Sequence, residues 1–166
     1  ERAMIDAIGK ALGRSYFEVL SENLLGIDLG VIHPQLVGFN LDDVLPKSPL
    51  KKIRIRHTVG LSDPFVKKDI RGNERINDGF PVTLEEYIQN QRLSSFKVKV
   101  SGDLFADMKR LGEFSDLVSG IDYSLSLDGN EQFTEMDKFI EFTKEIRSEL
   151  PILWDHISYI EQPLDR

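Results

Sequence analysis

The segment Phe96-Lys97-Val98-Lys99-Val100 alternates strictly between apolar and basic residues. Successive side chains of a β-strand point to opposite faces, so this alternation predicts a strand with both lysines on one face. Two further strand-like runs end in acids: Tyr123–Leu127 is followed by Asp128, and Ile157–Ile160 is followed by Glu161. Each run is separated from the next by enough residues for one helix. The sequence therefore predicts parallel strands joined by helices.

A further strand and three helices extend this pattern. The alternating run Ile53–Val59 predicts the first strand of the sheet. Helices are predicted at about 83–93, 103–118 and 134–150, with Thr83 and Thr134 as capping residues. The polar segment from Gly60 to Pro81 is too long for an ordinary connection, which makes it a candidate active-site loop. Polar groups in Asp69-Ile-Arg-Gly-Asn73 could contact a substrate there, although a solvated loop is the simpler interpretation.

The first part of the chain has a different pattern. Apolar residues recur at three- and four-residue spacing in residues 1–20, which predicts a helix, and Gly13 is a candidate stop. Residues 21–52 contain several glycines and prolines and predict an irregular connection. We therefore expect residues 1–52 to form the end of one domain with a connection, and residues 53–166 to form a second.

Composition restricts the partners and the compartment. The net charge of −7 repels phosphate backbones, so we expect no nucleic-acid partner. The sequence has no run of about 18 apolar residues, and we therefore expect no membrane span. Cysteine is absent, which excludes thiolate metal sites and a cysteine nucleophile. Together with the lack of a basic-then-apolar leader, this favours a cytoplasmic protein.

The polar face of the predicted sheet is the candidate functional surface. Helices that join parallel strands must cover the apolar face, so the polar face is expected to point into a barrel. Lys97, Lys99 and Asp128 would then lie near the C-terminal rim, where barrel active sites form. Lysines inside a barrel are costly unless acids or a metal accompany them, and Asp128 and Glu161 are the available acids. For one strand alone, the simpler interpretation is an antiparallel sheet with this face in water.

The same alternation predicts the orientation of four further side chains. If Glu161 points inward, Tyr159 and Ile157 point inward as well, and His156 and Ser158 point outward. His57, near the end of the first predicted strand, is a candidate substrate contact, although a structural role is the simpler interpretation for a lone histidine.

The residue types suit metal-assisted proton abstraction. Mg²⁺ prefers oxygen ligands, and carboxylates at successive strand ends provide them. Removing a proton next to a carboxylate builds a dianionic enediolate, which a divalent ion stabilises as a Lewis acid. A lysine acts as the base only as a neutral amine, and burial and a neighbouring ammonium both favour that form.

In these motifs the chain resembles the mandelate racemase/muconate lactonizing enzyme group of the enolase superfamily. Lys97-Val-Lys99, Asp128-Gly-Asn130 and Ile160-Glu161-Gln-Pro163 occur in that family's order and at similar spacing. The resemblance extends over about Ile53–Arg166. It implies an α/β fold, namely the first four βα units of a (β/α) barrel of TIM type. A helix from an N-terminal α+β capping domain would precede them.

The resemblance also implies a function. The expected enzyme is an isomerase or lyase that uses Mg²⁺ to abstract the α-proton of a small carboxylate substrate, giving a Mg-stabilised enediolate. Lys99 would be the acid/base, and Lys97 would contact the substrate carboxylate. Asp128 and Glu161 would be the first two metal ligands, with Asn130 in support. The third ligand and the opposite acid/base lie on later strands in the family, so racemisation, epimerisation, cycloisomerisation and dehydration are not distinguished.

The alternative is a non-catalytic α/β module, or an inactive fragment with an acidic interaction surface. A barrel of this type needs about 250 residues, and four strands cannot close one, so we expect the 166 residues to be part of a longer enzyme. In the alternative, both lysines would lie on a solvated face and the two acids would be ordinary strand-end residues. Members of the family are often homo-oligomers, but no pattern in these residues bears on that.

Overall fold

The structure, a computed structural model, describes residues 1–71 and 78–165 of the chain. It divides into two units, Glu1–Ile53 and Arg54–Arg166. Among the described residues, no helix is both long enough and apolar enough to cross a membrane.

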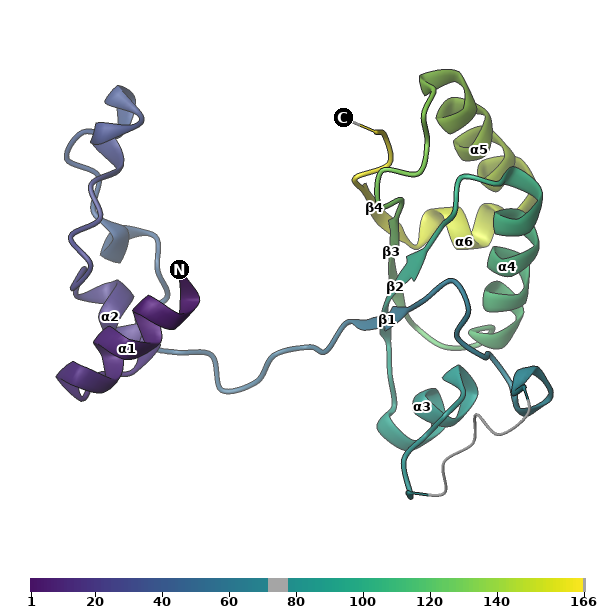
Figure 1. Ribbon diagram of the computed structural model, residues 1–166, viewed down its shortest axis with the longest axis horizontal. Coiled ribbons are helices and arrows are strands. Elements are labelled where there is room, and N and C mark those ends of the chain that lie inside the picture. The colour runs from purple at the N-terminus through teal and green to yellow at the C-terminus, as the bar shows by residue number, and fades with distance from the viewer. Residues whose placement is uncertain (72–77, 166) are drawn as a thin grey trace. The chain divides into compact units, whose positions relative to one another are not determined.

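A four-stranded parallel sheet forms the centre of the second unit (Figure 1). Its strands are β1 (His57–Val59), β2 (Ser95–Lys99), β3 (Ser124–Asp128) and β4 (Ile157–Glu161). They lie in the order β1-β2-β3-β4, so every crossover connection leads to the adjacent strand. The predicted mixed α/β fold with a parallel sheet is thus confirmed. The first strand is shorter than predicted, because residues 53–56 alternate in sequence but do not pair with β2.

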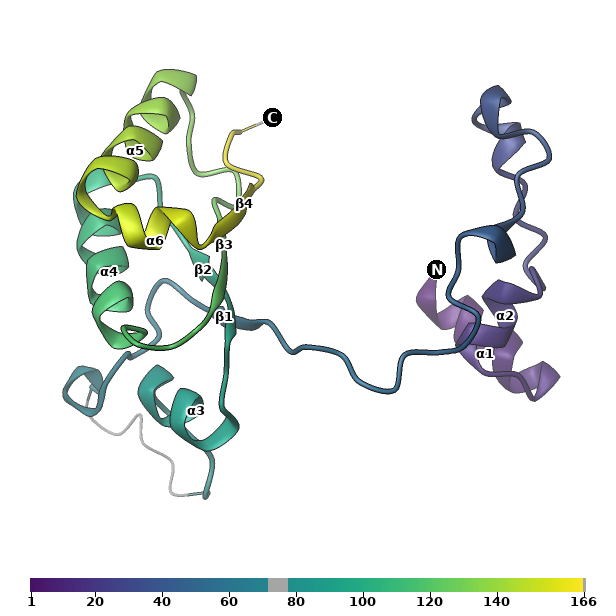
Figure 2. The same ribbon diagram turned by 180° about the vertical axis from the view of Figure 1, so that it is seen from behind.

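The helices of this unit all pack on one face of the sheet (Figures 1 and 2). They are α3 (Leu84–Gln91), α4 (Leu104–Leu117), α5 (Met136–Glu149) and α6 (Pro151–Asp155). The sheet contributes Phe96, Val98, Leu125 and Leu127 to a continuous core, and the helices contribute Leu84, Leu111, Phe114, Phe142, Ile146 and Leu153. Burial of these apolar side chains removes them from water and is the main force that holds helices against sheet. The apolar alternation in β2 and β3 therefore faces the helices, as predicted.

The helix boundaries follow from local chemistry. Thr83 caps α3 in a capping box, in which its Oγ1 accepts from Glu86 N and Glu86 Oε2 accepts from Thr83 N. The prediction that Thr134 caps the next helix is wrong: α5 follows Glu135, and no side chain caps it. Phe133, which precedes Thr134, is paired with Leu164 in an isolated β-bridge, and the helix begins only after this paired segment.

The helical segment is interrupted before Pro151 as predicted, but a short helix begins at Pro151 itself. α5 ends at Glu149, and Pro151 occupies the first turn of α6. Proline is tolerated there because the first-turn N–H groups have no helical acceptor.

The first unit consists of short helices. α1 (Arg2–Leu12) ends at Gly13, which adopts a left-handed conformation with φ 62°. α2 (Tyr16–Ser21) then begins with a capping box at Ser15, so the helix predicted over residues 1–20 is two helices. The predicted irregular connection contains three turns of 3₁₀ helix, η1 (Leu29–Val31), η2 (Pro34–Leu36) and η3 (Leu41–Asp43).

The long loop after β1 contains one more turn of 3₁₀ helix, η4 (Lys67–Asp69). There the Asp69 carboxylate accepts from the backbone N–H groups of Phe65 and Val66, so this polar residue stabilises its own loop. Gly72 and Asn73, the end of the motif considered as a substrate contact, lie outside the described residues.

Strand β4 contains one irregularity that matters for the site. Leu125 is paired with Ile157, but the next residue of β3, Ser126, is paired with Tyr159. Ser158 is therefore an extra residue of the bulge type, and it shifts the alternation of β4 by one position. As a result Ile157 packs against the helix-side core, so the prediction that it points to the polar face with Tyr159 and Glu161 is wrong.

Candidate functional site

The face of the sheet opposite the helices carries two rows of polar side chains. Paired residues of neighbouring parallel strands share a face, so the register defines the rows. One row runs through Lys97, Ser126 and Tyr159. The second row, at the C-terminal ends of the strands, runs through Lys99, Asp128 and Glu161. Four of the residues selected from the sequence are therefore brought to one face.

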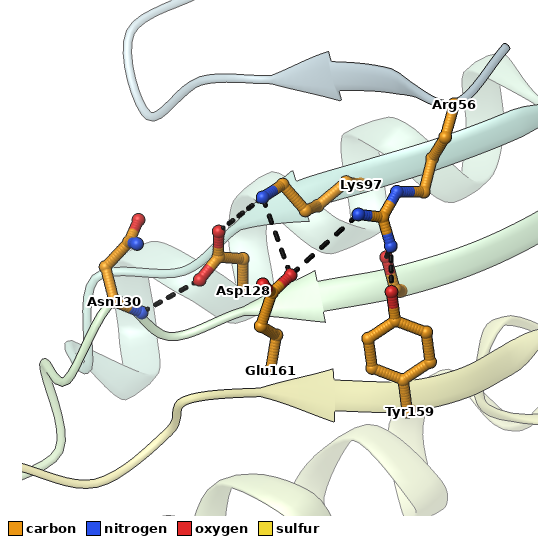
Figure 3. A network of polar contacts seen from close by, with 7 residues as sticks. Arg56, Lys97, Asp128, Asn130, Tyr159 and Glu161 are labelled. Atoms are coloured by element: carbon orange, nitrogen blue, oxygen red, sulfur yellow. Dashed lines mark hydrogen bonds and ion pairs between the residues drawn. The ribbon is translucent and has the colours of Figure 1, made fainter. Parts of the chain in front are cut away.

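Lys97 connects the two acids (Figure 3). Its Nζ lies 2.9 Å from Asp128 Oδ2 and 3.5 Å from Glu161 Oε2. The side chains differ in exposure: Asp128 is 3% exposed, Lys97 19% and Glu161 35%. A buried carboxylate is costly unless it is paired. The Lys97 ammonium supplies that pairing for Asp128, and it also holds Glu161 on the same side.

The ion pair changes the pKa of both partners. The hydrogen bond with Asp128 raises the pKa of Lys97, with a smaller contribution from the charge of Glu161, and burial opposes the change. Burial alone would raise the pKa of Asp128. The hydrogen bonds from Lys97 and from Asn130 N, with the charges of both lysines, outweigh it and lower that pKa. Lys97 is therefore charged and Asp128 ionised across the neutral range.

Lys99 occupies a different position from Lys97 although both lie on the same face. It is in register with Asp128, and its charge favours the ionised form of that acid. Within the described residues Lys99 makes no ion pair. Lys99 thus neighbours Asp128 in the row and acts on it by charge, without an ion pair.

Asn130 supports Asp128 through its backbone. Its N–H donates to Asp128 Oδ1 at 3.1 Å, while the residue adopts a left-handed conformation with φ 44°. Asparagine tolerates this conformation better than most residues, which gives a physical reason for its presence here. Asn130 thus lies beside Asp128, as its expected supporting role requires. The group that contacts Asp128 is its backbone N–H.

His57 lies apart from this cluster. It is paired with Phe96, so its side chain is on the helix side, where its ring lies against that of Tyr87 with the centroids 4.7 Å apart and the planes tilted by 41°. Burial there lowers the pKa of the imidazole. His57 therefore does not reach the cluster as a substrate contact, and the structural role that was the simpler interpretation agrees with its position: it shares the parity of Val59, on the helix side of the sheet.

Arg56 is a site residue that was not predicted. Its guanidinium donates to Ser126 Oγ at 3.2 Å and to the Tyr159 hydroxyl, and its Nη2 lies 4.0 Å from Glu161 Oε2 (Figure 3). It also lies over the Tyr159 ring, 5.7 Å from the centroid. The sequence contains a signal for this position. In the alternating run Ile53–Val59, Arg56 is two residues from Thr58, which is paired with Lys97, so alternation puts Arg56 on the same face as Lys97.

The loops that follow β3 and β4 run side by side and hold the two acids together. Pairing continues past the strands through Gly129 N to Glu161 O at 2.9 Å, Glu131 N to Gln162 O at 2.8 Å and Phe133 N to Pro163 O at 3.0 Å. Gly129 allows this close approach, because a Cβ at that position would lie 2.7 Å from the Cα of Pro163. The Asp-Gly motif thus has a structural reason: the glycine permits the packing that sets the spacing of the acids.

The donor set of this site suits a hard divalent cation. Two carboxylates from neighbouring strand ends converge on one positive group, and Mg²⁺ is commonly bound by one or two carboxylates together with water. Asp128 and Glu161 would hold such an ion. Over residues 1–71 and 78–165 no group of three or more His, Cys, Asp or Glu side chains is arranged to bind a metal.

Comparison with known proteins gives no family assignment. No family model matches the chain, and no curated protein or solved structure matches it. The class that the structure itself defines is a mixed α/β protein with a four-stranded parallel sheet.

Proposed function

We propose that this chain is part of a Mg²⁺-dependent isomerase or lyase that removes the α-proton of a small carboxylate substrate. One observation carries the proposal: Lys99, Asp128 and Glu161 are neighbours in one row at the C-terminal ends of three adjacent parallel strands. Active sites of parallel α/β proteins form at that end of the strands. The sequence resemblance to the enolase superfamily supports the same reaction.

We also propose that the sheet is the first part of a (β/α) barrel of TIM type. The strands follow one another in chain order, and the described helices of this unit cover the same face. In a barrel the helices form the outer ring and the other face points inward, which is the face that carries the acids and lysines here. In this proposal, residues 1–52 would include the end of a capping domain.

The residues would have distinct roles. Asp128 and Glu161 would hold the metal, and the Asn130 N–H would fix the orientation of Asp128. Lys99 would take the proton, because its amine is beside the acids and bound to neither. Lys97 would hold the substrate carboxylate by charge. A bound Mg²⁺ would act as a Lewis acid that draws negative charge from the substrate carboxylate.

A non-catalytic module is the second candidate function, and the Lys97 ion pairs favour it. Lys97 and Arg56 together compensate the two acids, so the cluster is electrostatically complete as a structural element. In that case Mg²⁺ would leave the melting temperature of the protein unchanged, and the acidic chain would act through its surface.

Deuterium exchange separates the two functions. The full-length protein is incubated in D₂O with Mg²⁺ and a panel of small carboxylates, and loss of the α-proton signal is followed by NMR. We expect exchange that a chelator abolishes and that Lys99→Ala removes. Lys109→Ala, which changes an exposed lysine of α4, is the matched control and should leave exchange intact. Exchange that survives in Lys99→Ala would place the base elsewhere, and no exchange with any carboxylate would favour the non-catalytic module.

A further inference from the structure

The position of the Lys97 ammonium has a consequence for cation binding. It contacts the same two oxygens, Asp128 Oδ2 and Glu161 Oε2, that face one another across β3 and β4. Figure 3 shows both contacts meeting at the nitrogen. A cation that bridges the two acids through these oxygens would require the space that the ammonium already fills.

Two cations bound to these oxygens would repel each other. Mg²⁺ binds carboxylate oxygens at about 2.0–2.1 Å, and an ammonium hydrogen-bonds them at about 2.7–2.9 Å. Both partners would then lie within a few ångströms of each other, in a place where Asp128 is nearly fully buried and solvent screening is weak. Repulsion between a double and a single positive charge at that separation favours one occupant at a time.

We propose that Lys97 is the resident cation of this site, and that Mg²⁺ binds only by displacing its ammonium from Asp128 and Glu161. Lys97 thereby sets the affinity of the site for divalent cations. The inference rests on the proposed function in one respect, namely the assignment of the two acids as metal ligands. It adds that the metal-free site is kept ordered and charge-compensated by the chain itself.

Displacement also couples the metal to the substrate. Displacement breaks two ion pairs but moves no proton, so the Lys97 ammonium keeps its charge. It then requires a new anionic partner. A substrate carboxylate provides one. Metal and carboxylate therefore favour each other's binding, and by linkage the effect is equal in both directions.

Lys99 is the matched comparison for Lys97. It has the same side chain, lies two residues away on the same face and is in register with Asp128. Within the described part of the chain it makes no ion pair with either acid. Loss of its charge should therefore change cation affinity far less than loss of the Lys97 charge.

The test measures Mg²⁺ binding to the metal-free full-length protein by calorimetry and by the shift in melting temperature. Lys97→Met keeps an unbranched side chain without the charge, and Lys99→Met is its control. We expect Lys97→Met to bind Mg²⁺ about ten- to a hundredfold more tightly than wild type, and Lys99→Met to change affinity by about threefold or less. Adding Asp128→Asn to Lys97→Met should abolish the tight binding. Lys97→Arg retains the charge and should bind no more tightly than wild type, which serves as a second test should Lys97→Met be poorly folded.

The outcomes are distinct. Mg²⁺ affinity in Lys97→Met that equals or falls below that of wild type overturns the displacement model, as does tight binding that persists with Asp128→Asn. If Lys97→Met binds Mg²⁺ more tightly but the wild-type protein exchanges no α-proton, the proposed function is refuted and the displacement model stands. The absence of Mg²⁺ binding in wild type and in every variant refutes both.

Discussion

The Gly129→Ala substitution tests whether the paired loops after β3 and β4 hold the site together. A Cβ at residue 129 would lie 2.7 Å from Pro163 Cα and 3.0 Å from Gln162 O. Both contacts are to backbone, so neither is relieved by rotation of a side chain. Gly129 is not in the left-handed region, and the expected effect is therefore steric.

The magnitude follows from this overlap. The loop 162–163 must move by several tenths of an ångström, which stretches the Gly129 N to Glu161 O and Glu131 N to Gln162 O hydrogen bonds. Overpacking of a tight contact costs typically about 1–3 kcal/mol. Gly112 in α4 is the matched control, because an added Cβ there has no neighbour within 4 Å. Replacing a helix glycine by alanine stabilises by about 0.5–1 kcal/mol, so the two Gly→Ala changes should have opposite signs.

Urea unfolding followed by fluorescence measures both variants. Trp154 is the single tryptophan of the chain and packs against the core from α6, so it reports on the unit that contains the sheet. The midpoint should fall for Gly129→Ala and rise for Gly112→Ala, with unchanged slopes. A neutral or stabilising Gly129→Ala would refute the view that the glycine permits a necessary close approach.

Three further predictions concern stability. Asp107→Asn should destabilise by about 2–4 kcal/mol in urea unfolding, because the buried carboxylate accepts from Ser101 N, Ser101 Oγ and Gly102 N. Asp116→Asn, at an exposed position of the same helix, is the control and should be near neutral. Thr83→Ala should cost about 1 kcal/mol by removing the α3 cap, and Thr83→Ser should restore most of it; equal loss in both would contradict the capping role. The lowered pKa of Asp128 means that its contribution to stability is complete above the ordinary range of an aspartate and is lost as the pH falls through the folded-state value. The stability difference between wild type and Asp128→Asn should therefore begin to narrow once the pH falls below the ordinary aspartate pKa of about 4, and a difference that stays constant on acidification would argue against the ion pair.

Alternation predicted the sheet well where strands are paired on both sides. In β2 and β3 the apolar positions are buried and the polar positions share the opposite face, because each strand has two neighbours that fix its orientation. The same pattern overestimated β1. Residues 53–56 alternate, but alternation is a local property, and a strand forms only where a partner accepts its hydrogen bonds.

Part of the site could be predicted from the sequence for the same reason. Lys97, Lys99, Asp128 and Glu161 share a face through register, which the order of the elements implied. What sequence alone did not give is the direct contact of Lys97 with both acids, since side-chain conformation depends on burial and on neighbouring charge. Arg56 was not predicted, although it shares the parity of Thr58 on the polar face, whereas His57 shares the parity of Val59 on the helix side.

The bulge at Ser158 gives the two ends of β4 opposite orientations. Plain alternation would put residues 157 and 161 on one face, whereas Ile157 packs on the helix side and Glu161 is paired with Asp128 on the polar face. A regular strand that included Ser158 would lose either the apolar contact of Ile157 or the alignment of the two acids. Deletion of Ser158, in contrast, would join Ile157 to Tyr159 and could keep every pair of β4 with β3 without a bulge. The position of Glu161 therefore depends on the backbone at one residue outside the Ile160-Glu161-Gln162-Pro163 motif, so an intact motif is no guarantee of an intact site.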